Sequence, residues 1–328
     1  MADYKGIKGF TIPNVSSDPD NPIQGQIWYN STSATLKGAL PGVGAWASGG
    51  NLNTQRYAQG LGIQTAALTV SGAGSPSSPS LTAIVEQYDG SSWTEIADVN
   101  TARAYGGACG TTTAGLYAGG AEPEVGNTEE YNGSAWSEVN DLNTARTYVQ
   151  GDGVQTAMFL VGGYASSTNQ ALVESYNGTS WTETTDINTA RRNGNDVGST
   201  TANLIIGGKI SSNSALCELW NGTSWTEVGD LNLARAQLGA AGTSSLAVAY
   251  GGATGPTAGS YTETETWNGT AWTEVADLAT ARQGGSASGA SQSSALYAGG
   301  STDGGSTQVT STEEWNKPDT TTVTVTTS

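Results

Sequence analysis

Short apolar runs alternate with polar turns along most of the chain, and the same order of runs returns again and again. A small, Gly-rich run precedes an apolar run that ends in a glycine pair, as at residues 159–163. A polar run with Glu and an aromatic residue follows, then an Asn-Gly or Asp-Gly turn and a run that begins with Trp. Short apolar runs bounded by turn residues predict strands, and such turns join antiparallel strands. Each unit therefore predicts four antiparallel strands, called a to d in chain order.

Two residues mark the period of this pattern. An Arg precedes strand a and a Trp opens strand d, and successive copies lie 43 to 47 residues apart. The arginines are Arg56, Arg103, Arg146, Arg191, Arg235 and Arg282. The tryptophans are Trp46, Trp93, Trp136, Trp181, Trp225 and Trp272. A period of this length is typical of a β-propeller, in which each unit forms one blade.

The two ends of the repeat region complement each other. The last unit, about residues 282–317, stops at Lys317-Pro318 before it reaches a strand d. The segment at about residues 45–50 aligns with a strand d but has no unit of its own. Pairing the two closes a ring and protects the strand edges. We therefore predict an all-β, six-bladed propeller of four-stranded antiparallel blades over residues 45–317.

The remaining segments lie outside the repeat. Residues 1–44 are predicted to form a small, irregular attachment segment, with a hairpin within residues 25–38, and residues 318–328 a C-terminal tail. The start of the chain has no apolar core of a signal peptide, and no apolar run is long enough for a transmembrane helix. We expect no membrane insertion.

The glycine pair after an apolar strand, followed by an aromatic residue and then Trp, resembles the kelch-type repeat. The resemblance recurs in all units and implies the propeller fold. It implies no single activity, because kelch-type proteins include adaptors, lectin-like binders and galactose oxidase-like enzymes.

A second resemblance lies at the N-terminus. MADYKGIKGF followed by GQIWYNSTSATLKG looks like the leader of fibre and appendage proteins in virions of tailed phages, particularly phages of marine bacteria and cyanobacteria. The units that end in NGTSWTEV are also similar to those proteins. The resemblance implies a virion structural protein in which residues 1–44 bind other virion proteins and the propeller is displayed on the particle surface or a tail appendage, in several copies or as a homo-oligomer.

Composition narrows the chemistry. The formal net charge of −17 argues against nucleic acid as a partner, because phosphate binding needs clustered Lys and Arg. The chain has no histidine, which excludes His-dependent catalytic triads and the His-containing copper site of galactose oxidase-like enzymes. We expect no cofactor, no metal and no catalytic residue.

A ring of glutamates shares the period of the arginines. These are Glu86, Glu129, Glu174, Glu218, Glu265 and Glu313, each two residues before the aromatic residue of strand c. One interpretation is a ring of ion-binding carboxylates. We favour a structural Glu–Arg pair in every blade, because a functional site needs asymmetry and this pattern has none.

Recognition is expected where the repeat does not dictate the sequence. The b–c loops, which connect strands b and c, differ in length and are small, polar and rich in Gly and Ser. Variable loops on a rigid scaffold are where binding residues concentrate, and these suit a glycan better than an apolar ligand. The candidate binding residues are Glu122, Glu124, Tyr164, Asn169, Lys209, Asn213, Tyr261 and Asp303.

We therefore predict a non-catalytic virion appendage protein that binds a host-surface glycan or receptor, or another virion protein. A bacterial kelch-like adhesin or lectin is the alternative. A carboxylate-dependent glycan hydrolase ranks last, because it needs two non-periodic carboxylates in one cleft. The candidate loops offer only four acidic residues for that role, Glu122, Glu124, Glu263 and Asp303.

Overall fold

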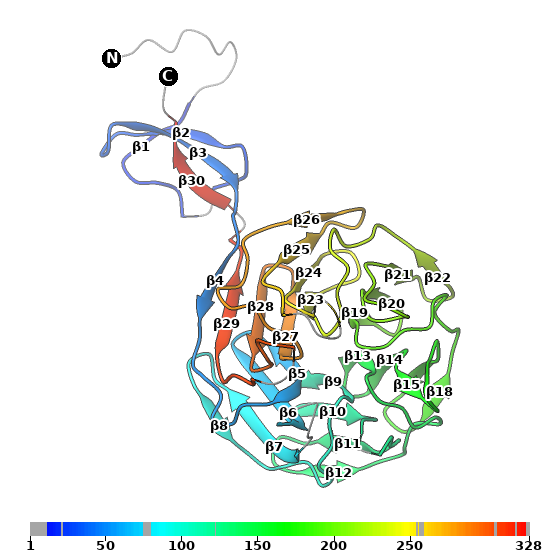
Figure 1. Cartoon of the computed structure of the whole chain (residues 1–328). Coiled ribbons are helices and arrows are strands. Elements are labelled where there is room, and N and C mark those ends of the chain that lie inside the picture. The colour runs from blue at the N-terminus through cyan, green and yellow to red at the C-terminus, as the bar shows by residue number, and fades with distance from the viewer. Residues whose placement is uncertain are drawn as a thin grey trace. The chain divides into compact units, whose positions relative to one another are not determined.

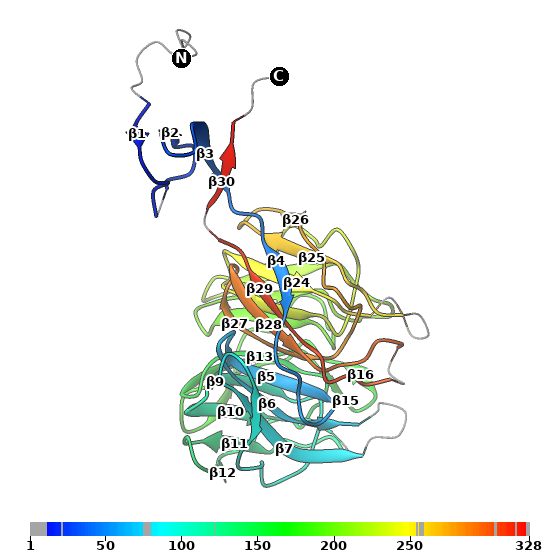
Figure 2. The same cartoon turned by 90° about the vertical axis from the view of Figure 1, so that its left-hand side faces the viewer.

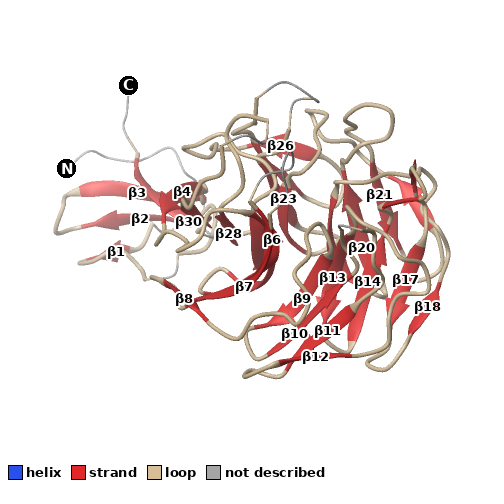
Figure 3. Cartoon of the chain, turned by 60° about the horizontal axis from the view of Figure 1, so that its bottom comes forward, coloured by secondary structure: helices blue, strands red, loops and turns tan. Residues whose placement is uncertain are grey.

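The computed structural model describes residues 12–20, 22–74, 80–121, 123–253, 255, 259–304, 307–318 and 320–325. These residues form strands, turns and loops, and none of them is helical (Figure 3). The described ranges accordingly contain no helix that could cross a membrane. Contacts divide the chain into two units, one made of residues 45–316 and one made of residues 1–44 together with 317–328.

Residues 45–316 form six four-stranded antiparallel sheets arranged in a ring (Figure 1). Each sheet is one blade, numbered in chain order, with strand a innermost. Blade 1 contains β5 (Tyr57–Ile63), β6 (Ala66–Ala73), β7 (Leu81–Tyr88) and β8 (Trp93–Glu95). Blade 2 contains β9 (Gly107–Thr111), β10 (Ala114–Ala118), β11 (Thr128–Tyr131) and β12 (Trp136–Glu138). Blade 3 contains β13 (Gln150–Val154), β14 (Ala157–Val161), β17 (Val173–Tyr176) and β18 (Trp181–Glu183).

The other three blades repeat this order. Blade 4 contains β19 (Asn195–Ser199), β20 (Ala202–Ile206), β21 (Cys217–Trp220) and β22 (Trp225–Glu227). Blade 5 contains β23 (Gly239–Gly242), β24 (Ala247–Tyr250), β25 (Thr264–Trp267) and β26 (Trp272–Glu274). Blade 6 contains β27 (Ser286–Ser291), β28 (Ser294–Ala298), β29 (Thr312–Asn316) and β4 (Ala45–Ser48). A short hairpin of β15 (Tyr164–Ala165) and β16 (Thr168–Asn169) lies in the b–c loop of blade 3.

Strand β4 closes the ring as the sequence predicts. It pairs antiparallel with β29, and Trp46 lies opposite Trp315 (Figure 1). The amide of Gly300 in blade 6 also donates to the carbonyl of Arg56 at the start of blade 1. The prediction of an all-β propeller closed by an N-terminal strand is confirmed.

A buried ion pair joins the start of strand a to strand c in every blade. The N–O distances are 2.5–3.0 Å, and the paired side chains are at most 5% exposed. The pairs are Arg56–Glu86, Arg103–Glu129, Arg146–Glu174, Arg191–Glu218, Arg235–Glu265 and Arg282–Glu313. In blade 3 the carboxylate of Glu174 also accepts bonds from the backbone and side-chain amides of Asn143. These extra donors offset the cost of removing the carboxylate from water.

The glycine pairs connect successive blades. Gly162 and Gly163 have φ values of +63° and +108°, and the amide of Gly163 donates to the carbonyl of Arg191 in the next blade. A Cβ on Gly162 would lie 2.6 Å from that carbonyl oxygen. Only glycine combines this φ with this close approach.

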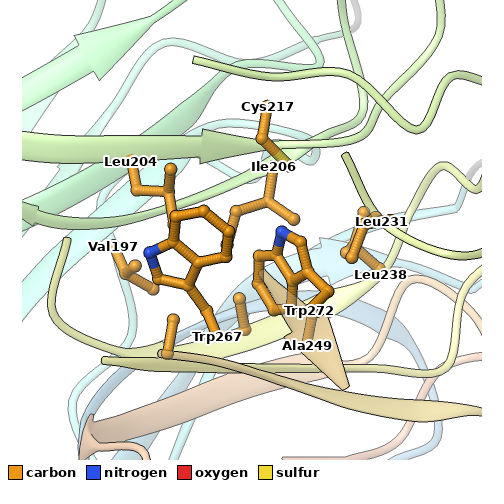
Figure 4. Packing of buried hydrophobic residues seen from close by; sticks show 11 residues of the cluster. Val197, Leu204, Ile206, Cys217, Leu231, Leu238, Ala249, Trp267 and Trp272 are labelled. Carbon is orange, nitrogen blue, oxygen red and sulfur yellow. The ribbon is translucent and has the colours of Figure 1, made fainter. Parts of the chain in front are cut away.

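Aromatic pairs fill the space between blades. In blade 5, Trp267 and Trp272 lie opposite each other on neighbouring strands, with ring centroids 5.4 Å apart. They pack on Leu204 and Ile206 of blade 4 (Figure 4). Cys217, one of two buried free cysteines, lies in the same cluster, and Cys109 is the other.

The smaller unit is a separate four-stranded sheet (Figure 2). Its strand order is β1 (Asn14–Val15), β2 (Ile27–Asn30), β3 (Thr35–Pro41) and β30 (Thr320–Thr324). Strands β2 and β3 form the predicted hairpin. The carboxylate of Asp18 accepts hydrogen bonds from the side chains of Trp28 and Asn30 in β2. Strand β30 pairs antiparallel with β3, so both ends of the chain build this sheet. The alternation of Thr and Val in residues 320–328 is typical of an edge strand or a disordered tail, and the structure places Thr320–Thr324 in a strand. Its pairing with β3 could not be predicted, because no local pattern specifies a partner at the other end of the chain.

Candidate binding site at the channel mouth

Strand a of each blade borders a central channel with a volume of about 540 Å³. At one mouth of the channel, the second residue after the periodic Arg has a left-handed backbone in five blades. Their φ values lie between +54° and +63°, and the residues are Tyr105, Tyr148, Asn193, Gln237 and Gly284. Backbone bonds link neighbouring members, from Asn193 to the Tyr148 carbonyl, from Gln237 to the Asn193 carbonyl and from Gly284 to the Gln237 carbonyl. These bonds join the members from blades 3 to 6 and stabilise a conformation that costs a non-glycine residue about 1–2 kcal/mol.

A pocket of about 340 Å³ opens beside these residues. Its wall includes four of the residues with positive φ, Tyr105, Tyr148, Asn193 and Gln237. The rings of Tyr105 and Tyr148 lie against each other, with centroids 4.6 Å apart and planes 34° apart. The other side of the pocket carries polar and charged groups from the b–c loops.

Arg192 is one of two cations, with Lys209, that line the pocket. Its guanidinium carbon lies 4.2 Å from the centroid of the Tyr164 ring, and its Nη1 donates to Oδ1 of Asn169 at 3.1 Å. The side-chain amide of Asn169 donates in turn to the carbonyls of Lys209 and Ile210. Asn169 thus ties the loop of blade 3 to the loop of blade 4 and orients the guanidinium over the aromatic ring.

The two cations of the pocket occupy a pair of positions that recurs in the other blades. The residue after the periodic Arg bridges to the residue after the glycine pair, and in blade 4 these residues are Arg192 and Lys209. In the other blades where this bridge is observed, the pairs are Ala104–Ala121, Thr147–Tyr164, Ala236–Ala253 and Gln283–Ser301. Among the described residues, no carboxylate forms an ion pair with Arg192 or Lys209. The pocket therefore offers positive charge on a chain whose net charge is −17.

The structure gathers part of the predicted loop set at this pocket. The pocket is lined by Tyr164, Lys209 and Asn213, and Asn169 accepts a hydrogen bond from Arg192 without lining the pocket. Glu124 is exposed and accepts a bond from the Ser166 amide outside the pocket wall.

Three predicted loop residues remain. Tyr261 lies outside the lining, its backbone bonded to Gly252 and Arg282. Asp303 binds the backbone and hydroxyl of Thr307 in its own loop, also outside the lining. Glu122 lies outside the described residues.

Sequence reasoning missed Arg192 as a binding residue and overlooked two acids in the channel. Arg192 is the one described arginine outside the six periodic ion pairs, which was the available signal. The two acids are Asp152 on β13 and Asp196 on β19. Among the six strands a, only these two contain an acidic residue, and this departure from the repeat was their signal.

The channel acids lie in an unusual environment. Among the described residues that line the channel, Asp152 and Asp196 are the only ones of the types Asp, Glu, Lys and Arg. Burial raises the pKa of Asp152 to about 6. Burial, and then the charge of Asp152, raise the pKa of Asp196 well above its ordinary value. The same burial, helped by both carboxylates, raises the pKa of the nearby Cys109 thiol.

The periodic ion pairs supply no binding groups. Their side chains are buried, and each Glu is occupied by an Arg and by backbone amides, as shown for Glu218 with Arg191 and the amides of Asn188 and Thr189. Among the described residues, no group of three or more acidic or thiol side chains is arranged to hold a metal ion.

Comparison with solved structures finds many chains of related fold. One of them, YjhT, has a TM-score of 0.66 and 13% sequence identity, and the match covers 80% of this chain and 95% of YjhT. At this identity the match shows the fold alone, a β-propeller. No family model matches the sequence, and no curated protein matches it.

Proposed function

We propose that the propeller is a non-catalytic binding module whose ligand is a glycan with an anionic group, held in the pocket at the channel mouth. The observation that carries this proposal is the pair Arg192 and Lys209 in blade 4, where blades 2 and 5 have alanines. A charged pair without a carboxylate partner in the described part of the chain is suited to an external anion. The flanking tyrosines suit the face of a sugar ring.

The pocket favours a polar ligand over an apolar one. Besides the two cations it presents Asn193, Asn213 and Gln237, and its volume of about 340 Å³ fits one or two sugar residues better than a large cofactor. Arg192 is held over Tyr164 before any ligand arrives, which limits the ordering cost of binding.

The contacts of the acidic residues on the b–c loops argue against a glycan hydrolase. Glu124 is exposed, and Asp303 is engaged within its own loop. Glu263 bonds to the neighbouring amide of Thr262. These described acids are held by separate local contacts, whereas a hydrolase needs two of them across one substrate.

For the smaller unit the proposal is attachment to a virion protein. Its described surface exposes large apolar side chains, with Ile23 77% exposed, Val43 73% and Leu40 51%. In an acidic, polar chain such groups are suited to burial against another protein. Together with the phage-like N-terminal sequence, this supports a role as a virion fibre or appendage protein that displays the propeller to a host surface.

The binding proposal is tested with the full chain on an array of acidic and neutral glycans. We expect binding to acidic glycans that weakens with salt and is lost in Arg192→Ala. Lys37→Ala is the matched control, because it removes one positive charge from the smaller unit and should bind like the parent chain. Binding to neutral glycans that is unchanged in Arg192→Ala would overturn the anionic-ligand proposal.

The virion proposal has its own test. Purified phage particles from the source population should contain the chain in several copies, and removal of residues 1–44 should abolish its incorporation. A chain found only on bacterial cells, with glycan binding intact after that truncation, would favour the adhesin alternative.

A further inference from the structure

The channel acids occupy one interface between blades and no other. Asp152 lies opposite Phe159 in blade 3, and Asp196 lies opposite Ile205 in blade 4. Phe159 and Ile205 belong to one hydrophobic cluster between these blades, so the two carboxyl groups enter the same interface. The equivalent pairs at the other interfaces, found from the same cross-strand registers, are Leu61 with Ala108, Cys109 with Gly151, Val197 with Ala240, Ala241 with Ala287, and Ser288 with Gly60.

The two acids are supported differently. Asp152 accepts a bond from the Gly153 amide with Oδ1 and from the Gly198 amide with Oδ2, both at 2.7 Å. The second bond crosses from blade 4 to blade 3. Asp196 accepts a bond from Nδ2 of Asn203 with Oδ2, at 2.8 Å. Its other oxygen, Oδ1, has no donor.

Two buried oxygen atoms are thus left without partners. Asp196 is 3% exposed and Asn203 is fully buried, and Oδ1 of each lacks a hydrogen bond. A buried acceptor without a partner costs about 1–3 kcal/mol. A native structure keeps such atoms where a ligand, an ion or a water molecule completes them. Because Asp196 lines the channel, the missing partner can reach it from there.

We propose that Asp152, Asp196 and Asn203 form a binding site for Ca²⁺ between blades 3 and 4, at the wall of the channel. The donor set consists of carboxylate and amide oxygens, which hard cations prefer. Ca²⁺ accepts irregular geometry and water ligands from the channel, whereas Mg²⁺ demands a near-ideal octahedron.

The electrostatics of the channel agree with a bound cation. No Lys or Arg is found among the described lining residues, so the facing carboxylates have no counter-charge from the protein there. Without a cation, burial raises the pKa of both carboxyl groups, and the charge of Asp152 raises that of Asp196 further. The raised pKa of Cys109 disfavours a thiolate and therefore a soft metal.

The test uses the full chain after treatment with a chelator, titrated with CaCl₂ by calorimetry at pH 7.5. We expect saturable binding of one Ca²⁺ per chain and a higher Tm in CaCl₂ than in EDTA. Asp196→Asn and Asp152→Asn should each reduce the affinity at least about tenfold and remove the shift in Tm. Glu124→Gln is the matched control and should keep both, because that carboxylate is exposed and outside the channel.

Other results would overturn the proposal. One is a chain that shows no Ca²⁺ binding and no Tm shift, with the two acids sharing a proton instead. Another is equal Ca²⁺ binding by the parent chain and both channel variants, since the ion would then sit elsewhere. An equal response to MgCl₂ would overturn the choice of Ca²⁺. Should a channel variant fail to fold, anomalous diffraction from the parent chain with Ca²⁺ decides by the presence or absence of a peak between Asp152 and Asp196.

Discussion

Blades 4 and 5 are built on the same framework and differ where the ring meets its channel. Each has a buried ion pair, Arg191–Glu218 or Arg235–Glu265, and each has paired aromatic rings on strands c and d. At the mouth, however, blade 4 presents Arg192 and Lys209 where blade 5 has two alanines.

The same contrast holds inside the channel. The interface between blades 3 and 4 contains two carboxyl groups, and the interface between blades 4 and 5 contains Val197 and Ala240 at the equivalent positions. The other five interfaces are formed without a carboxyl group at these positions. The difference teaches that function in a symmetric repeat is to be sought where one unit departs from the others.

The largest effect should come from the shared framework. Arg191→Leu in blade 4 and Arg235→Leu in blade 5 each leave a buried Glu without its partner, which costs about 3–5 kcal/mol. We expect similar losses for the two variants in denaturant unfolding. A much smaller loss in blade 4 would break the comparison, because the framework would then differ between blades.

Glycan binding should depend on the cations of blade 4. Arg192→Ala should weaken binding of an acidic glycan by about 1.5–3 kcal/mol, which is roughly 10- to 150-fold, by removing charged hydrogen bonds. Its stability should change by no more than about 0.5 kcal/mol, since alanine occupies this position in blades 2 and 5. Calorimetry and thermal unfolding of the same samples measure both. A large loss of stability would mean that Arg192 is structural.

The channel acids predict a pH dependence in the absence of divalent cations. The folded-state pKa of Asp152, about 6, lies above the ordinary value of 3.8, so the folded protein holds this proton more tightly. Stability from this group is therefore present at low pH and is lost as the pH rises from about 4 through 6.

Asp152→Asn removes this group together with its repulsion of Asp196, so the difference between the two proteins reports on the pair of channel acids. In EDTA the parent chain should match the variant near pH 4 and become less stable than it, by about 1–3 kcal/mol, above pH 6. Denaturant unfolding across this range measures the difference. A constant difference between pH 4 and 7 would contradict the assignment of a raised pKa.

The smallest effect should come from restoring the repeat in blade 6. Ala279 stands where the other blades have Asn, and its amide donates to Glu313 as theirs do. Ala279→Asn adds side-chain bonds like those of Asn143 to Glu174 and to the Trp181 carbonyl, and should stabilise by about 0.5–1.5 kcal/mol. Asn143→Ala should lose a similar amount. No gain from Ala279→Asn would show that the closing blade is shaped differently from the others.

The local elements of the propeller could be predicted from the sequence because each is specified by nearby residues. Gly178 supplies the positive φ of the turn between β17 and β18, with φ +85°, and Asn177 caps that turn with its side chain. The periodic Arg and Glu could be recognised as structural because a single local requirement recurs in every unit. The spare Trp46 segment predicted the closing strand for the same reason.

The candidate sites depended on the tertiary structure. Arg192, Tyr164 and Asn169 come from two blades and meet because neighbouring loops converge at the channel mouth. Asp152 and Asp196 face each other because one points from its blade toward the next and the other back toward the previous one. The repeat by itself determined which residues build a blade. The contacts between residues of different blades were decided only when the ring closed. Such contacts depend on strand register and on the face of the sheet from which each side chain points.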